Sequence, residues 1–174
     1  RLLLGLCMFF AVAWKAVSPD YLTGDFFEYR LLTDERFAPI ATGLGGVDPE
    51  ILAGNRERVE SLTVKSEGTV IEMNGVTDVQ TLSFLDTWWT IGIEALLAVL
   101  FLIPSSRLNV LRDVSMLVFL VTTYASAPVI GVGWLLCIFG IAQTCSSFRR
   151  IAFFAAFLLI QLYMMPLASV MTGQ

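Results

Sequence analysis

Apolar residues form five runs along the chain, and one polar stretch separates the first run from the other four. The runs cover residues 2–17, 88–103, 114–124, 128–145 and 151–170. An apolar run of about 20 residues is typical of a helix that crosses a bilayer. The pattern therefore predicts an all-α transmembrane helical bundle, with helices at 1–18, 87–104, 106–124, 127–145 and 149–170.

The number of helices depends on residues 114–145. As one helix, this segment of about 32 residues would extend roughly 48 Å, too long for one crossing without a large tilt. YASAPVIGVG interrupts it, because the residue before a proline avoids helical geometry and glycines follow. We therefore expect a helical hairpin and five helices in all. One long kinked helix, and so four crossings, is the alternative.

The polar stretch, residues 19–86, predicts a small α+β insertion domain. FFEYRLLTDERF has the mixed character of an amphipathic helix near a membrane surface. Asp48 and Pro49 predict the start of another helix, as its N-cap and first residue. Apolar and polar residues alternate in SLTVKS, TVIEMNG and VQTLSFL, with Glu67-Gly68 and Asn74-Gly75 between them. This arrangement predicts two or three antiparallel strands joined by tight turns.

Composition supports a membrane location. The chain is 56% hydrophobic and only 15% charged, with a mean hydropathy of +0.75, values that indicate an integral membrane protein. Charge is unevenly distributed: residues 19–86 hold 13 acidic and five basic residues, whereas the rest holds two acidic and six basic residues. Nucleic-acid binding is excluded, because no basic patch accompanies exposed aromatic residues.

Basic residues predict the orientation of the bundle. In the five-helix arrangement Arg1, Arg107, Arg112 and the Arg149-Arg150 pair all fall on one side, which the positive-inside rule assigns to the cytoplasm. The N-terminus is then cytoplasmic and residues 19–86 are extracytoplasmic. A four-helix arrangement would move the Arg149-Arg150 pair to the acidic side, so the charges favour five helices.

Histidine is absent from the chain, which excludes histidine-ligated haem, metal or chlorophyll and histidine-based catalysis. The three cysteines, Cys7, Cys137 and Cys145, form no C-x-x-C pair and are expected to behave as small apolar residues. We expect no metal site, no catalytic residues and no cofactor; a quinone or a lipid is the ligand class that stays open.

Glu94 lies within the apolar run at 88–103. A charged group at the bilayer centre costs about 2.5–3.5 kcal/mol on insertion scales and usually has a partner or a function. Lys15, near the outer end of the first helix, is the expected partner, with an axial offset of roughly 6 Å at helical rise. The alternatives are that Lys15 extends alone to the interface, or that Glu94 handles protons or a quinone headgroup.

Seven other polar or amphipathic residues are candidates for lesser roles. Arg107, Arg149 and Arg150 are expected to set the topology or to bind lipid headgroups. Trp134, Gln161 and Tyr163, like Gln143, are expected to make interhelical contacts. A lipid or quinone contact at Trp134, Gln161 and Tyr163 is the alternative.

The first resembling segment is RLLLGLCMFFAVAWKAVSPDYL. The first helix lies in it, with Lys15 near its end, and a proline and an acid, Pro19 and Asp20, follow. The second, IGIEALLAVLFLIPSSR, holds a glutamate and, 13 residues later, an arginine. These segments resemble the DoxX-like family of small bacterial membrane proteins, including its MauE-type members. The resemblance covers the first helix and residues 88–135. Arg1, Lys15, Glu94 and Arg107 match the recurring polar positions of the family.

The resemblance implies a four-helix core in the bacterial cytoplasmic (inner) membrane and a role as accessory or maturation partner of a redox system. This chain departs from the family in its insertion at residues 19–86 and in its expected fifth helix. We expect a non-catalytic accessory or assembly subunit of a larger membrane complex, with the acidic insertion as docking surface. A quinone- or thiol-linked redox component that uses Glu94 and Lys15 is the alternative.

Overall fold

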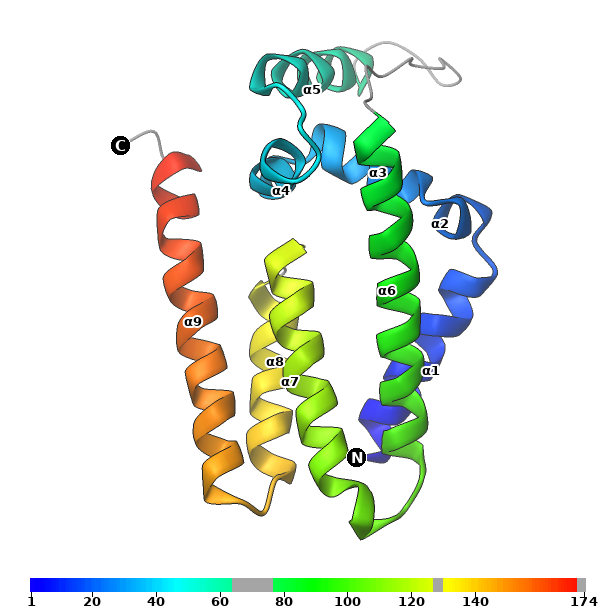
Figure 1. The fold of residues 1–174 in the computed structure, drawn as a ribbon, viewed down its shortest axis with the longest axis vertical. Helices are drawn as coiled ribbons and strands as arrows, with labels where there is room; N and C mark the ends of the chain where they lie inside the picture. Colours follow the sequence, from blue (N-terminus) through cyan, green and yellow to red (C-terminus); the bar gives the residue numbers. More distant parts are fainter. Residues whose placement is uncertain (64–76, 127–129, 172–174) are drawn as a thin grey trace. The chain divides into compact units, whose positions relative to one another are not determined.

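A computed structural model describes residues 1–63, 77–126 and 130–171, and all the secondary structure in these ranges is helical (Figure 1). The predicted all-α class is therefore confirmed. The chain divides into two compact units. We call residues 1–14 with 90–174 the bundle unit and residues 15–89 the acidic unit. The domain boundaries expected from the sequence stay a prediction.

The bundle unit contains five of the described helices. These are α1 (Leu2–Ala16) up to Trp14, α6 (Thr77–Leu102) from Thr90 onward, α7 (Asn109–Ser126), α8 (Ile130–Gln143) and α9 (Ser147–Met171). The short 3₁₀ helix η2 (Ser106–Leu108) precedes α7. α7 and α8 are separate and antiparallel, as the hairpin interpretation predicted, and α9 packs against both (Figure 1).

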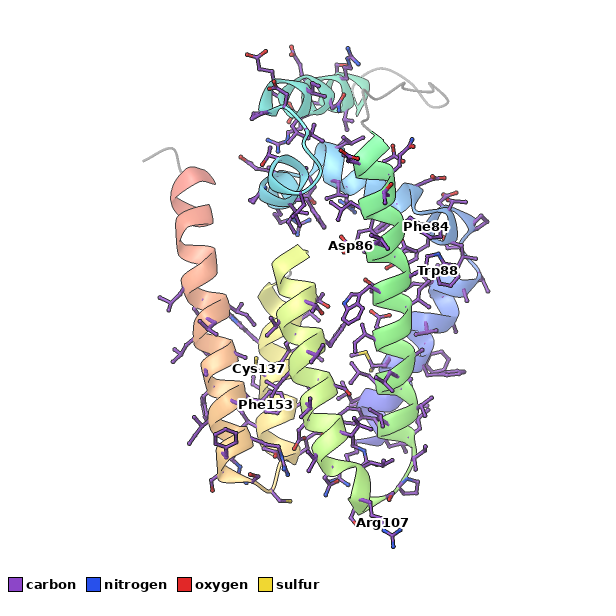
Figure 2. The ribbon with its side chains drawn as sticks, in the orientation of Figure 1. Phe84, Asp86, Trp88, Arg107, Cys137 and Phe153 are labelled. Carbon is purple, nitrogen blue, oxygen red and sulfur yellow. The ribbon has the colours of Figure 1, made fainter. Side chains whose placement is uncertain are left out.

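The core of the bundle unit is apolar and draws on all five helices. Its members include Leu4, Leu97, Leu120, Cys137 and Phe153. Figure 2 shows Cys137 and Phe153 in the space between α8 and α9.

Gly140 on α8 packs directly against the ring of Phe153 on α9. A Cβ atom at this position would lie 2.3 Å from the ring of Phe153. Only a residue without a side chain fits here, so Gly140 fixes the distance between the two helices.

The acidic unit consists of short helices around an apolar core. They are α2 (Pro19–Thr23), α3 (Asp25–Thr33), the 3₁₀ helix η1 (Glu35–Phe37), α4 (Ala38–Gly43), α5 (Pro49–Thr63) and the first half of α6. Leu31, Leu32, Ala41, Leu52 and Val79 are almost completely buried.

Two local signals explain how these short helices begin and end. α5 starts at Pro49, and the carboxylate of Asp48 accepts the backbone N–H of Glu50 at 2.9 Å, which confirms the predicted N-cap. Gly24, with a φ of 93°, ends α2 and begins α3. This left-handed conformation strains residues other than glycine.

No strand occurs among the described residues, so the α+β character expected for the insertion is not observed. The segment Val79–Leu85, predicted as a strand, lies in α6, and Ser61–Thr63 ends α5. The remaining predicted strand positions, 64–76, lie outside the described residues. Val79, Ser83 and Thr87 are buried at intervals of four, the spacing of one helical face. Because no glycine or proline separates them from the apolar run that follows, the helix continues through both segments.

One helix in the described part of the chain, Asp78–Leu102, is long and apolar enough to cross a membrane. At 1.5 Å per residue it extends about 38 Å, more than the hydrocarbon core of roughly 30 Å. Leu2–Ala16 and Gly131–Gln143 are apolar but shorter. The membrane helix expected at 87–104 therefore begins about ten residues earlier than its apolar run.

Candidate functional site

Arg112, on the first turn of α7, binds the C-terminal end of α6. Its side chain is almost fully buried, at 1% exposure. Nε donates to the carbonyl of Leu100 at 2.5 Å, Nη1 donates to the carbonyl of Ser105 at 2.8 Å, and Nη2 donates to the carbonyl of Ile103. The last carbonyls of a helix lack intrahelical donors, and the guanidinium supplies several at once. Arg112 therefore caps α6 and orders the turn into α7.

Asp113, the next residue, is bound by Thr144 and Arg149, at the turn between α8 and α9. Its Oδ2 accepts Thr144 Oγ1 at 2.7 Å and Arg149 Nε at 2.6 Å. Asp113 and Thr144 are only 3% and 2% exposed. A buried carboxylate needs an opposite charge and hydrogen bonds to be tolerated. We call Asp113, Thr144 and Arg149 the Asp113 clasp.

Arg112 and Asp113 together hold both turns at one end of the bundle unit. α6 ends there, α7 begins there, and α8 passes into α9 there (Figure 1). The described bonds of this pair join helices and turns, so the arrangement fixes the packing of the bundle.

Asp113 is not among the candidate residues predicted from the sequence. Apart from Glu94, it is the one carboxylate side chain in residues 87–174. A single acid among basic residues beside an apolar run is a signal for a buried ion pair. That signal does not name the partner, because Arg149 lies 36 residues away and its approach depends on the α8–α9 turn.

Glu94 and Lys15, predicted to form an intramembrane pair, lie in different units. Glu94 is buried on α6 in the bundle unit, at 7% exposure. Lys15 belongs to the acidic unit, where its ammonium lies 5.3 Å from the ring centroid of Tyr21. Their ion pair therefore stays a prediction.

The three arginines assigned to topology or headgroup binding differ in their surroundings. Arg107 is exposed and projects away from the end of the bundle unit (Figure 2). Arg150 is exposed too, and its Nε donates to the carbonyl of Thr144 at 3.3 Å. Arg149 is only partly exposed, because it belongs to the Asp113 clasp.

Trp134, Gln161 and Tyr163 are not shown to share a site. The ring of Trp134 on α8 contacts Phe157 on α9, with centroids 6.4 Å apart, as expected for an interhelical contact. Gln161 Nε2 is buried and has no hydrogen-bond partner among the described residues. The side chain of Tyr163 lies outside them. A lipid or quinone contact at these residues stays a prediction.

The described part of the chain contains cysteine, aspartate and glutamate side chains, the residue types here that can hold a metal ion or carry thiol chemistry. No group of three or more cysteine, aspartate or glutamate residues is arranged there to hold a metal ion. All three cysteines are free thiols: Cys137 is buried in the core, whereas Cys7 and Cys145 are exposed.

In the acidic unit, Asp34 forms a charged cluster with two arginines. Its Oδ2 lies 2.6 Å from Arg36 Nη2 and 3.5 Å from Arg30 Nη1. The side-chain hydrogen bond from Arg36 lowers the pKa of Asp34 below its ordinary value of 3.8, against the opposing effect of burial. The cluster closes the turn between α3 and η1.

Comparison of the chain with models of protein families, with curated proteins and with solved structures found no match.

Proposed function

We propose that this chain is a membrane-embedded, non-catalytic accessory or assembly subunit of a larger bacterial membrane complex. In this proposal the bundle unit crosses the inner membrane several times, with the end that carries Arg112 and Asp113 at the cytoplasm. The acidic unit lies outside and is the docking surface. The DoxX-like resemblance of residues 1–22 and 88–135 supports the same class of protein.

The observation that carries the proposal is the placement of polar and apolar side chains in the bundle unit. Large apolar residues face outward on α7, α8 and α9, and Val114, Leu135 and Leu158 are each more than two-fifths exposed. Arg112 and Asp113 are buried inside. A bundle in water places charges outward and hides large apolar patches. A bundle in lipid satisfies its polar groups internally.

The docking role rests on the charge of the acidic unit. Glu50, Glu57 and Glu60 are exposed on α5, and residues 19–86 carry 13 acidic against five basic residues. Such a surface favours a partner with a basic face and steers its association at low ionic strength.

A redox component is the second candidate function, and the burial of Glu94 on α6 supports it. A carboxyl group inside an apolar helix can take part in proton or quinone-headgroup handling. The two candidate functions predict different companions in the purified sample: a partner membrane protein for the accessory subunit, and a bound quinone for the redox component.

Purification in a mild detergent tests the proposal. We expect the chain to co-purify with a specific membrane protein in a stable complex, and the complex to weaken as salt rises. The charge-reversal variant Glu57→Lys/Glu60→Lys releases the partner, whereas Leu158→Ala, on the outward face of α9, retains it. A monodisperse lone protein with bound quinone would overturn the proposal in favour of the redox component.

A further inference from the structure

A half-open cavity lies in the bundle unit between the start of α1 and the end of α8. Its volume is about 360 Å³, within the usual range of roughly 300–1,000 Å³ for small-molecule sites. The lining residues are Arg1, Leu3, Leu4, Phe139, Ala142 and Gln143. Most of this wall is hydrocarbon, and one side chain, Arg1, carries a full positive charge.

The two polar residues of the wall can both serve an acidic ligand. The guanidinium of Arg1 presents a planar set of donors that matches phosphate and carboxylate groups. Gln143 donates its amide to Met116 Sδ at 3.5 Å. A thioether is a weak acceptor, so this amide gains by turning to a charged oxygen.

The apolar part of the wall is open toward the outside of the bundle. Leu3 and Phe139 are 66% and 41% exposed although they border a cavity. An aliphatic chain laid along them would leave contact with solvent or bulk lipid and gain the close packing that the cavity lacks. The cavity therefore suits a molecule with an acidic head and an aliphatic tail.

We infer that this cavity binds an anionic phospholipid of the cytoplasmic leaflet, with its phosphate at Arg1 and Gln143 and part of one acyl chain along Leu3 and Phe139. The inference rests on the proposed membrane location, in which this end of the bundle lies at that leaflet. The inner leaflet carries anionic lipid, which attracts basic residues near its surface. A quinone fits less well, because its neutral headgroup makes no use of the guanidinium.

Lipid titration of the delipidated full chain in a nonionic detergent, followed by native mass spectrometry, tests the site. We expect phosphatidylglycerol to bind about fivefold to tenfold more tightly than phosphatidylcholine with the same acyl chains. Arg1→Gln removes this preference, and Arg1→Lys keeps most of it. Ala142→Trp, which fills the cavity, weakens the binding of both lipids.

Two matched variants control for surface charge and added bulk. Arg58→Gln removes an exposed cation on α5 of the acidic unit, and Ala155→Trp adds the same ring at an exposed position on α9; both leave the lipid preference unchanged. Equal affinity for the two lipids, or an equal loss in Arg1→Gln and Arg58→Gln, would overturn the site. A quinone that displaces phosphatidylglycerol at equal concentration would also overturn it.

The lipid titration tests the site at Arg1, and the co-purification experiment tests the accessory function, so a negative result in one does not imply a negative result in the other. Binding is measured in micelles on the isolated chain, so a missing partner complex does not change the lipid ratio. A bundle that binds no lipid at Arg1 can still copurify with its partner.

Discussion

The buried charges of the bundle unit are accommodated by specific partners. Asp113 is tolerated inside an apolar bundle because Thr144 and Arg149 both donate to the same carboxylate oxygen. Arg149 remains partly exposed, with 23% of its side chain accessible. The pair thus lies between a fully buried ion pair and a surface one in strength.

Removing one partner of this pair should therefore destabilise the bundle measurably. We expect Asp113→Ala to lower the free energy of unfolding by about 2 kcal/mol, between the values typical of surface and buried pairs. Thermal unfolding in detergent of Asp113→Ala, Arg149→Met and the double variant measures the coupling. The double variant should lose less than the sum of the single losses, and Arg150→Gln should change little. Additive losses would refute the clasp.

The Asp34–Arg36 pair gives the acidic unit a defined response to acid. The folded-state pKa of Asp34 lies below its ordinary value of 3.8. The charged pair therefore stabilises the fold at neutral pH, and this contribution is lost as the pH falls from about 4 through the folded-state pKa.

We expect Asp34→Asn to lower the melting temperature of the full chain at pH 7. The difference from the unmodified chain should shrink as the pH falls below about 4. Arg36→Gln should move the acid transition to higher pH, because it removes the hydrogen bond that lowers the pKa. Melting curves between pH 7 and pH 2 measure both effects; a difference that stays constant over this range would contradict the assignment.

At the scale of single residues, the sequence indicated which charged residues are unusual, but it did not predict which residues they contact. Glu94 was identified because a lone acid in an apolar run is conspicuous, and it is buried as that pattern suggests. Arg149 was assigned to topology, since its contact with Asp113 depends on how α8 turns into α9. Pairing across 36 residues is set by tertiary packing, which periodicity alone does not contain.

At the scale of helices, prediction depended on the length of each pattern. The long apolar runs and the break at YASAPVIGVG predicted separate helices α7 and α8, whereas Val79–Leu85 was wrongly predicted as a strand. Seven residues of alternating character fit a strand and a helical face equally well. The helix is selected because Val79, Ser83 and Thr87 bury one face and α6 continues without a break.

Close contact between α8 and α9 makes Gly140 intolerant of any side chain. We expect Gly140→Ala to destabilise the bundle by about 1–3 kcal/mol, because its Cβ would collide with the ring of Phe153. Gly131→Ala on the same helix meets open space and should be neutral or slightly stabilising. Phe153→Leu should partly rescue Gly140→Ala in thermal unfolding. Equal melting temperatures for the two glycine variants would contradict this packing.

The cap that Arg112 places on α6 should act locally. In Arg112→Met the carbonyls of Leu100, Ile103 and Ser105 lose the hydrogen bonds from the guanidinium, at a cost of about 2 kcal/mol. Hydrogen exchange measured by mass spectrometry should then accelerate in residues 100–110 more than in residues 140–150. Asp113→Ala should produce the opposite pattern. Uniform acceleration in both variants would refute separate roles for the two residues.

At the scale of the whole molecule, the two units have opposite surface chemistry. The bundle unit exposes large apolar side chains and buries Glu94, Arg112 and Asp113, whereas the acidic unit exposes glutamates on α5 and has its own apolar core. The apolar runs and the uneven distribution of charge along the chain predicted an acidic module beside an apolar bundle without knowledge of any contact. They could not predict that the described part of the insertion is helical.

Cysteine labelling tests most directly whether the bundle crosses the membrane with its basic end inside. Cys145 is exposed between α8 and α9, at that end, and Ala53 is exposed on α5 in the acidic unit. Two variants are compared in intact bacterial cells. The variant Cys7→Ala keeps Cys145 as its exposed cysteine. The triple variant Cys7→Ala/Ala53→Cys/Cys145→Ala has its exposed cysteine at position 53 instead. The buried Cys137 remains in both as a common background.

We expect a membrane-impermeant maleimide to label the cysteine at position 53 in intact cells. It should label Cys145 only after the cells are made permeable. Labelling of Cys145 in intact cells, or protection of position 53 until the cells are made permeable, would contradict the proposed orientation of the bundle.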